Sequence, residues 1–206
     1  MLRAPGDGSS TLPESTEERQ TGDTVATKKS ESMLGRWDAW YGDTPSVPRY
    51  YGSADTYELV ADFLRGMAVE DWGCGLAAYA DHHEGRYTGV DGTASQYVDT
   101  IADLTAFRSA SPAILLRHVL EHNYDWRLVL DNAIASTTER LAIVLFMPLA
   151  EETTVVHEDV GGLGVPDISF ALDDITQPIT DAGFSVTVQS VETGMGYTET
   201  LISCTR

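Results

Sequence analysis

A glycine-rich turn and a later acidic residue are the features of this sequence that point most directly to chemistry. Gly73 and Gly75 lie in the stretch V-E-D-W-G-C-G-L-A-A, and Asp91 closes the stretch Y-T-G-V-D, 20 positions after Asp71. Glycines let the backbone approach a ligand closely, and the N-terminus of a following helix offers unpaired N–H groups. An acid at the tip of the next strand can accept hydrogen bonds from ribose hydroxyls. The spacing therefore indicates a site for a cofactor that contains a nucleoside.

Two kinds of nucleoside cofactor fit this pattern. G-C-G-L-A-A matches the dinucleotide-binding fingerprint with alanine in its third place, and Asp91 fits the ribose acid of an NAD site. Asp71, however, ends the preceding strand two residues before Gly73, where its carboxylate would repel a pyrophosphate. A cationic sulfonium with an amino-acid tail tolerates such an acid. The second kind is favoured, and an NAD(P)-dependent oxidoreductase stays as an alternative.

Hydrophobic periodicity predicts the elements that position these residues. Helices are expected at 31–41, 54–64, 76–82, 94–101, 124–136 and 168–182. Strands are expected at 67–71, 86–91, 101–104, 113–119, 141–147, 184–191 and 197–204, and a long loop at 149–166. Alternating strands and helices before a closing hairpin predict an α/β fold. We expect a doubly wound, mostly parallel seven-stranded sheet with a C-terminal antiparallel hairpin.

Composition separates a tail from the expected folded part. Residues 1–30 hold four Lys/Arg and five Asp/Glu and few large apolar side chains, which predicts a flexible tail. Residues 31–206 form the expected domain, with nine arginines, 27 acids and no lysine. This charge repels phosphate backbones, so nucleic acid is not expected as a partner. Solubility, adaptation to high salt and a GC-rich coding bias are all open explanations for it.

The expected setting is cytoplasmic. Cys74 and Cys204 form no disulfide framework, and Cys74 lies inside the glycine turn, which favours a reducing compartment. No apolar run reaches the roughly 18 residues of a membrane span. The N-terminal residues lack the apolar centre of a signal peptide. No membrane association is expected.

Taken together, these motifs resemble those of class I S-adenosylmethionine-dependent methyltransferases. The resemblance extends from about Tyr57 to Cys204, and its best pieces are V-E-D-W-G-C-G (69–75), G-V-D (89–91), A-D-L (102–104) and L-R-H-V-L-E-H (116–122). The last piece is similar to the H-V-L-E-H stretch that follows the fourth strand of small-molecule methyltransferases. Ala77 stands where the family has its third glycine. The resemblance implies a Rossmann-like methyltransferase fold with S-adenosyl-L-methionine as cofactor.

The same resemblance assigns the methionine end of the cofactor to the glycine turn. Asp71, Gly73 and Gly75 would line that end, and Cys74 would contribute backbone. Arg117, at the end of the fourth strand, would also face the methionine portion.

Four further residues would hold the nucleoside. Asp91 would accept from the ribose hydroxyls, and Gly92 would lie beside the adenine. Asp103 would accept from the adenine amino group, with the Leu104 N–H nearby. Helix capping or simple solvation is the alternative role for both acids.

His118-x-x-Glu121-His122 also has the spacing of an inverted zincin motif, H-x-x-E-H. A zinc hydrolase needs both histidines on one helical face. Here His118 follows a strand-like run, and no third ligand is placed by pattern, so no metal is expected. Glu121 and His122 are expected to cap or buttress the helix that begins near Tyr124.

Two segments are candidates for the wall of a substrate site. Aromatic residues crowd the region 31–53, and Trp37, Tyr41 and Tyr50 are expected to touch substrate if this region is a lid; core packing is the alternative. The loop at 149–166 is the second segment, with a solvated loop as the alternative.

Methyl transfer needs an aligned nucleophile, exclusion of water and removal of one proton. His118 is the expected general base and His157 the second choice, because histidine titrates near neutral pH. We expect O-methylation of a small hydroxylated molecule, such as a sugar or another metabolite. A non-catalytic methyltransferase-like protein that binds a partner is a further alternative.

Overall fold

The computed structural model describes residues 34–42, 54–194 and 196–206. The expected tail at 1–30, Tyr50, and the parts of the expected lid at 31–33 and 43–53 lie outside the described residues. None of the described helices is long and apolar enough to cross a membrane.

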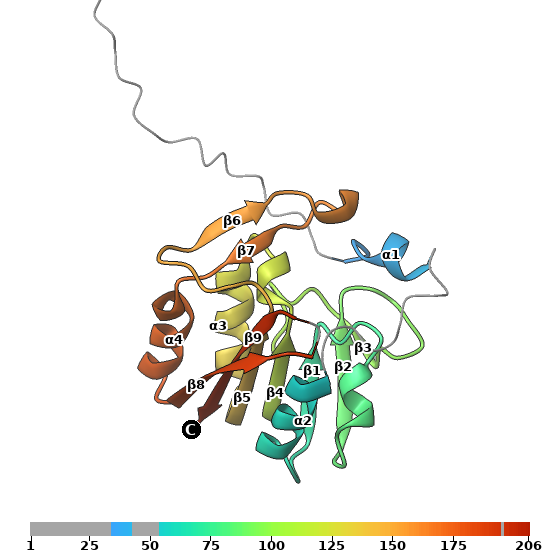
Figure 1. The fold of residues 1–206 in the computed structure, drawn as a ribbon. Coiled ribbons are helices and arrows are strands. Elements are labelled where there is room, and N and C mark those ends of the chain that lie inside the picture. Colours follow the sequence, from blue (N-terminus) through green and yellow to red (C-terminus); the bar gives the residue numbers. More distant parts are fainter. Residues whose placement is uncertain (1–33, 43–53, 195) are drawn as a thin grey trace, which may run out of the picture.

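The centre of the structure is a seven-stranded sheet with the order β3-β2-β1-β4-β5-β9-β8 (Figure 1). The strands are β1 (Val69–Trp72), β2 (Tyr87–Asp91), β3 (Thr100–Ile101), β4 (Ser111–Arg117), β5 (Thr137–Leu145), β8 (Ser185–Glu192) and β9 (Thr198–Thr205). The first five strands pair in parallel, β9 is antiparallel to β5, and β8 is antiparallel to β9. The predicted α/β sheet with its C-terminal antiparallel hairpin is confirmed.

The strand order creates a crevice beside β1. From β1 the chain continues to β2 and β3 on one side, and then crosses to β4 and β5 on the other. In open α/β sheets, ligands bind outside the carboxyl ends of the strands where the order reverses in this way. The glycine turn follows β1 and His118 follows β4, so both lie at this point.

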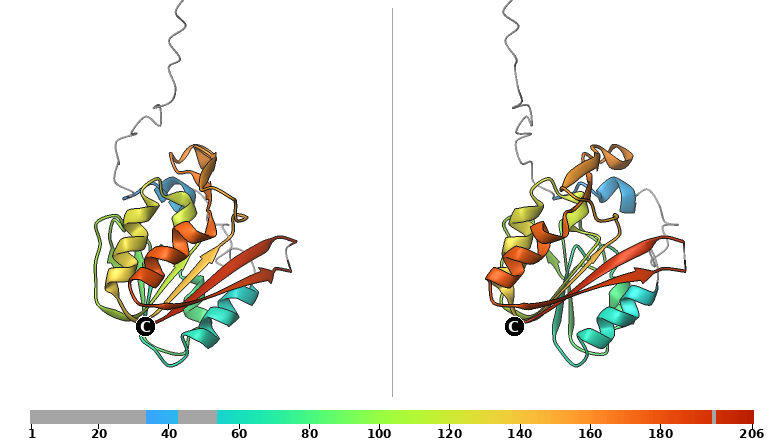
Figure 2. Two further views of the ribbon diagram at one scale, coloured as in Figure 1. Left: turned by 90° about the vertical axis from the view of Figure 1, so that its left-hand side faces the viewer. Right: turned by 60° about the vertical axis from the view of Figure 1, so that its left-hand side comes forward.

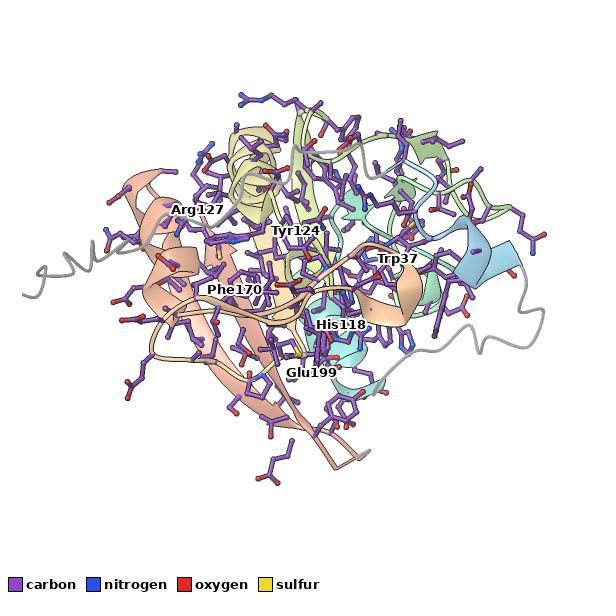
Figure 3. The ribbon with its side chains drawn as sticks, turned by 90° about the horizontal axis from the view of Figure 1, so that it is seen from above. Trp37, His118, Tyr124, Arg127, Phe170 and Glu199 are labelled. Atoms are coloured by element: carbon purple, nitrogen blue, oxygen red, sulfur yellow. The ribbon has the colours of Figure 1, made fainter. Side chains whose placement is uncertain are left out.

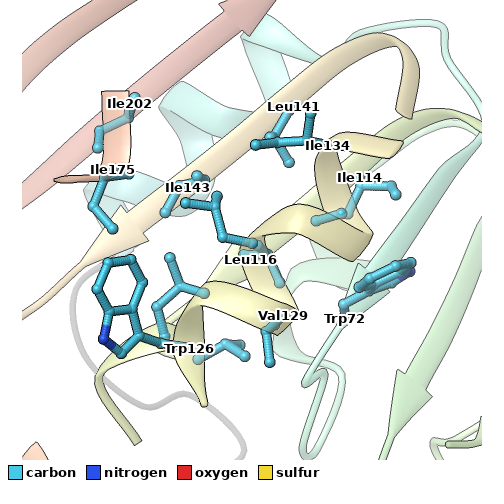
Figure 4. Packing of buried hydrophobic residues seen from close by; sticks show 14 of the residues in the cluster. Trp72, Ile114, Leu116, Trp126, Val129, Ile134, Leu141, Ile143, Ile175 and Ile202 are labelled. Carbon is cyan, nitrogen blue, oxygen red and sulfur yellow. The ribbon is translucent and has the colours of Figure 1, made fainter. Parts of the chain in front are cut away.

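Helices cover both faces of the sheet (Figure 2). Helix α2 (Ala54–Phe63) packs on one face, and α3 (Trp126–Ser136) and α4 (Leu172–Asp181) cover the other. The apolar run of β4 serves both cores, because successive strand residues point to opposite faces. Leu115 is buried with α2, whereas Leu116 is buried with α3 and α4 (Figure 4).

Two predicted helices are wrong. The region 76–82 holds only a short 3-10 turn, η1 (Ala78–Asp81), and no α-helix. The three residues Gly73, Gly75 and Ala77 have positive φ angles, and this backbone conformation prevents an α-helix from starting before Ala78. Ala77 adopts this left-handed conformation at +53°, which costs an L-residue about 1–2 kcal/mol.

The region 94–101 is not helical either. Asp99 pairs with Gly89 of β2 through its backbone N–H and its carboxylate, and this holds the chain alongside β2 as it enters β3.

The expected loop at 149–166 contains a strand. β6 (Thr154–His157) pairs with β7 (Asp167–Ser169), and the 3-10 turn η3 (Val160–Gly162) lies between them. The helix expected at 168–182 therefore begins only at Leu172. This β6–β7 ribbon and the short helix α1 (Asp38–Gly42) lie at the same end of the sheet (Figure 1).

Glu121 joins the segment after β4 to the segment after β5. It lies in the 3-10 turn η2 (Leu120–His122) and is fully buried. Its Oε1 accepts a hydrogen bond from the Phe146 N–H at 2.7 Å. Glu121 therefore buttresses the end of β5 and not the helix near Tyr124 as predicted. Burial raises its pKa to about 8, although backbone hydrogen bonds from Phe146 and Met147 oppose the shift.

Leu116→Ala should lower the free energy of unfolding by about 2–5 kcal/mol, because it removes a fully buried side chain from the centre of the sheet. Leu128→Ala, on the exposed side of α3, is the matched control and should change it by less than about 0.5 kcal/mol. Urea denaturation measures both. Equal effects of the two substitutions would contradict the described packing.

The raised pKa of Glu121 predicts a specific pH dependence of stability. The folded protein holds a proton on this group up to about pH 8, whereas an unfolded glutamate loses it near pH 4.3, so the group makes the protein less stable as pH rises between those values. Glu121→Gln should reduce the difference in unfolding free energy between pH 5 and pH 8 by about 3–4 kcal/mol. Glu58→Gln, at an exposed position, should leave that difference unchanged. If Glu121→Gln also left it unchanged, the raised pKa of Glu121 would be refuted as the cause of the pH dependence.

Candidate active site

A cavity of about 270 Å³ lies at the carboxyl ends of β1, β2 and β4. Its floor is formed by the glycine turn and the strand ends, and its opposite wall by residues of the α1 segment and of the loop between β6 and β7. In Figure 3, His118 and Glu199 lie next to each other and Trp37 lies toward α1. Its lining includes Trp37, Tyr41, Tyr57, Asp71, Gly73, Cys74, Gly75, Asp91, Gly92, Leu104, Arg117, His118, His122, Phe146, Val160, Leu163 and Asp167.

Both glycines of the turn have a positive φ, which L-residues rarely adopt, and both have close neighbours. A Cβ on Gly73 would lie 2.5 Å from Val119 Cγ2, and a Cβ on Gly75 would lie 2.7 Å from the Tyr41 hydroxyl oxygen. The turn is therefore packed closely against the segment after β4 on one side and against α1 on the other.

Asp91 organises the turn from the end of β2. Its Oδ2 accepts from the Gly75 N–H at 2.8 Å, and its Oδ1 accepts from the Thr93 N–H at 2.8 Å. Burial raises the pKa of Asp91, and these backbone hydrogen bonds oppose the shift. A carboxylate has further lone pairs, so Asp91 can accept from a ligand without losing these bonds. The neighbouring Gly92 carbonyl accepts from the Gly35 N–H at 2.8 Å, which connects this strand end to the α1 segment.

Asp71 is a buried carboxyl at the start of the turn. Burial raises its pKa to about 7, although Tyr87 donates a hydrogen bond to its Oδ2 at 2.9 Å and Arg117 lies near enough to oppose the shift. The group therefore changes charge near neutral pH while facing the cavity. Cys74 also lines the cavity, and burial raises the pKa of its thiol.

The predicted adenine residues are divided between the cavity wall and the loop behind it. Leu104 lines the cavity, whereas Asp103 is not among its lining residues. Asp103 Oδ1 accepts from the Thr105 N–H at 3.0 Å and from the Thr105 hydroxyl at 2.7 Å.

A buried polar cluster stands at the end of β4. Arg117 Nη2 donates to Glu199 Oε1 at 3.0 Å, and the Arg117 guanidinium carbon lies 4.2 Å from the centre of the Tyr57 ring. Thr56 donates to the other oxygen of Glu199. Burial alone would raise the pKa of Glu199, but the hydrogen bonds and charges of His118 and Arg117 keep it below its ordinary value. Sequence reasoning missed Glu199, because only the sheet topology brings the start of β9 to this point.

His118 has both ring nitrogens engaged within this cluster. Nδ1 lies 3.3 Å from Arg117 Nη1, and Nε2 lies 3.0 Å from Glu199 Oε1. Burial lowers its pKa to about 4, although the Glu199 carboxylate opposes this, so the ring is neutral at pH 7. Its backbone is left-handed at φ +56°, which turns the chain sharply out of β4.

The second histidine of the motif, His122, belongs to a different cluster. Its Nδ1 lies 3.0 Å from the Pro166 carbonyl oxygen and 3.3 Å from Asp167 Oδ1. His157 contacts the same carboxylate through Nδ1 at 3.0 Å from Oδ2, but its side chain is 66% exposed and is not among the residues that line the cavity.

The three residues of the H-x-x-E-H pattern thus have separate partners. Within residues 34–42, 54–194 and 196–206, no group of three or more His, Cys, Asp or Glu side chains is arranged to hold a metal ion.

Aromatic and apolar side chains form the remaining wall. The rings of Trp37 and Tyr41 lie 6.3 Å apart by their centres, and both line the cavity. Phe146, Val160 and Leu163 complete this side, and sequence reasoning did not single them out. Phe146 could have been found, because it is the second-last residue of the predicted strand 141–147, at the carboxyl edge of the sheet.

No family model matches the sequence, and a search of curated proteins gives no match. Solved structures do resemble it. The 1,6-didemethyltoxoflavin-N1-methyltransferase of Burkholderia thailandensis, with bound S-adenosylhomocysteine, is 15% identical with a TM-score of 0.66, over 83% of this chain and 86% of that one. The magnesium protoporphyrin IX methyltransferase of Synechocystis PCC 6803, with bound S-adenosylmethionine, is 15% identical with a TM-score of 0.58, over 86% and 100%.

A third similar structure comes from a complex between the Haloferax volcanii Trm112 methyltransferase activator and a methyltransferase. It is 14% identical with a TM-score of 0.59, over 82% of this chain and 95% of that one. At these identities the likeness concerns the fold. The chain has the Rossmann-like fold of class I S-adenosylmethionine-dependent methyltransferases.

Proposed function

We propose that this protein is an enzyme that transfers the methyl group of S-adenosyl-L-methionine to a hydroxyl of a small molecule. The observation that carries the proposal is the position of the cavity, which lies at the strand-order reversal of this fold and is lined by the glycine turn, Asp71 and Asp91. Buried acids suit a ligand that carries positive charge and ribose hydroxyls. They do not suit a pyrophosphate, which weakens the NAD(P) alternative.

The residues present fit this cofactor. Asp91 and Gly92 would hold the ribose and the edge of the adenine, and Leu104 would pack beside the adenine with Asp103 near its amino group. Asp71, Gly73, Cys74 and Gly75 would surround the methionine end together with Arg117. The observation behind this assignment is that Asp91 keeps acceptor capacity beyond its two backbone bonds, and that Cβ atoms at Gly73 and Gly75 would fill the cradle.

The opposite wall would bind the methyl acceptor. Trp37 and Tyr41 from the α1 segment and Val160 and Leu163 from the loop after β6 line this wall of the cavity. We assign the lid role to the region 31–53 and the substrate wall to the loop 149–166. A largely apolar wall with a few polar groups is typical of sites for small molecules.

Bound S-adenosylmethionine supplies an electrophilic methyl group on a positively charged sulfur. The protein's part is to orient the acceptor oxygen, to exclude water and to remove a proton. The buried Arg117–Glu199 pair fixes the end of β4, and the aromatic wall would shield the bound acceptor from water.

Calorimetric titration of the purified protein with S-adenosylhomocysteine, with NAD⁺ run in parallel, tests the proposal. We expect micromolar binding of S-adenosylhomocysteine and no heat with NAD⁺. Binding of NAD⁺ alone would replace the proposed function by the oxidoreductase alternative. Binding of neither compound would favour a protein that keeps the fold for interaction with a partner.

Asp91→Ala should weaken the binding of S-adenosylhomocysteine by about 30-fold or more, because it removes charge-assisted hydrogen bonds to the ribose. Asp131→Ala, on an exposed position of α3, is the control and should bind as the wild type does. Circular dichroism verifies that both variants are folded. Unchanged affinity in a folded Asp91→Ala protein would refute the ribose assignment.

The pKa of Asp71 predicts how binding depends on pH. The ionised carboxylate attracts the ammonium group of the ligand, and the fraction ionised falls as the pH drops below about 7. Affinity should therefore be about fivefold to tenfold weaker at pH 6 than at pH 8. In Asp71→Asn the affinity should be lower and nearly independent of pH. An equally steep pH dependence in that variant would assign the titration to another group.

A further inference from the structure

His122 stands in the cavity with one ring nitrogen committed to the protein. It lies in η2, directly after the sharp turn at His118, and its ring is flanked by Trp37 at 5.1 Å and by Phe146 at 5.3 Å between ring centres. All three residues line the cavity. The imidazole is therefore part of the wall that faces the methyl acceptor.

The partners of Nδ1 determine which nitrogen carries the proton. A carbonyl oxygen can only accept a hydrogen bond, so the contact to the Pro166 oxygen requires a proton on Nδ1. The nearby Asp167 carboxylate favours the same arrangement. In the neutral ring Nε2 then carries a lone pair, and no described residue forms a hydrogen bond with Nε2.

The other two histidines considered for proton transfer are placed differently. Both ring nitrogens of His118 are engaged by Arg117 and Glu199. His157 is exposed on the outer side of Asp167 and lies outside the cavity lining. Among the three, His122 alone combines a place in the cavity wall with a ring nitrogen that is left for a ligand.

The charge state of His122 suits a base. Burial lowers its pKa, while the Pro166 carbonyl and the Asp167 carboxylate oppose the shift, so the ring is neutral at pH 7. The titratable groups around it are Asp167 on β7, His157 beyond that carboxylate, His118 at the end of β4, and the adjacent Glu121. When the ring becomes protonated, Asp167 stabilises the positive charge.

We propose that His122 is the general base of the methyl transfer, that it takes the proton from an aromatic hydroxyl of the acceptor, and that Asp167 and the Pro166 carbonyl orient it. The acceptor oxygen forms a bond to the methyl carbon, and the carbon–sulfur bond breaks with its electron pair passing to sulfur. The hydroxyl proton moves to Nε2, and the imidazolium returns it to water after the product leaves. This inference rests on the proposed function and deepens it.

We infer an aromatic acceptor from the aromatic side chains of the cavity wall and from the weak basicity of histidine. Trp37, Tyr41 and Phe146 offer ring faces and edges to a planar molecule. A phenolic hydroxyl has a pKa of about 10, which is much closer to the pKa of histidine than the pKa of an aliphatic alcohol is. Proton transfer from a phenol to a weak base such as histidine is therefore easier.

Nitrogen-15 NMR of the histidine side chains in the S-adenosylhomocysteine complex tests the geometry without turnover. The chain has five histidines, and single His→Gln variants assign their signals. At pH 7 we expect the proton of His122 on Nδ1, with an unprotonated Nε2 whose signal moves when catechol is added. A proton on Nε2, or a charged ring at pH 7, would overturn the assignment of the base.

Transfer of tritiated methyl groups to phenol and catechol tests the chemistry. His122→Gln should lower kcat by about 100-fold or more while leaving the affinity for S-adenosylhomocysteine unchanged, and the exposed Asp131→Ala on α3 should stay within about twofold of wild type. Asp167→Asn should lower kcat more than it changes KM. It should also move the acidic limb of the pH–rate profile to lower pH, because the carboxylate raises the pKa of His122.

The outcomes separate this inference from the proposed function. No binding of S-adenosylhomocysteine by the wild type would overturn the proposed function itself. Binding without transfer to any phenol would overturn the aromatic-hydroxyl acceptor. Full turnover by His122→Gln would overturn the base alone and leave the methyltransferase function standing.

Discussion

The buried carboxylate of Glu199 is the interaction on which the arrangement of the site depends. Because β9 runs antiparallel to β5, its first residues return to the carboxyl ends of the parallel strands. There Glu199 accepts hydrogen bonds from Arg117 at the end of β4 and from Thr56 on α2, and its Oε1 lies 3.0 Å from His118 Nε2. Removing one partner of a buried ion pair typically costs about 3–5 kcal/mol, because the remaining charge is left uncompensated. The reversed last strand thus fixes the end of β4 from the opposite side of the sheet.

This constraint divides the polar groups of the cavity into two sets. His118 is held in the Glu199 cluster and is neutral at pH 7. The chain turns through the left-handed backbone of His118 and brings the His122 ring to within 5.1 Å of the Trp37 ring, centre to centre. The acids Asp71 and Asp91 lie around the glycine turn and line the same cavity. A ligand with a positive charge near Asp71 and ribose hydroxyls near Asp91 would leave the His122 side open to a second molecule.

The sequence predicted those parts of the fold whose signal is local. The apolar runs at 113–119 and 141–147 correspond to β4 and β5, because strands buried on both faces need continuous apolar residues. The glycine turn and Asp91 were also predicted from local sequence, because their spacing along the chain reflects one strand–turn–strand unit. Leu104, Arg117 and Trp37 were predicted as site residues and line the cavity.

The remaining parts depend on backbone conformation and on distant contacts. Alanine is a strong helix former and gives no sign in the sequence that Ala77 has a positive φ. The helix at 76–82 was therefore predicted where the structure has only a 3-10 turn. The β6 strand is exposed at every position and therefore has no alternating pattern, so the β6–β7 ribbon was missed. Glu199 and Asp167 come to the site only through β9 and through that ribbon, and the different partners of His118 and His122 follow from those two elements.

A crystal structure of the complex with S-adenosylhomocysteine would locate the cofactor relative to the glycine turn and to His122. We expect the ribose hydroxyls within hydrogen-bond distance of Asp91, the methionine end beside Gly73 and Gly75, and the sulfur facing the space between His122 and Trp37. A nucleoside bound elsewhere on the sheet, or a sulfur turned away from His122, would contradict it.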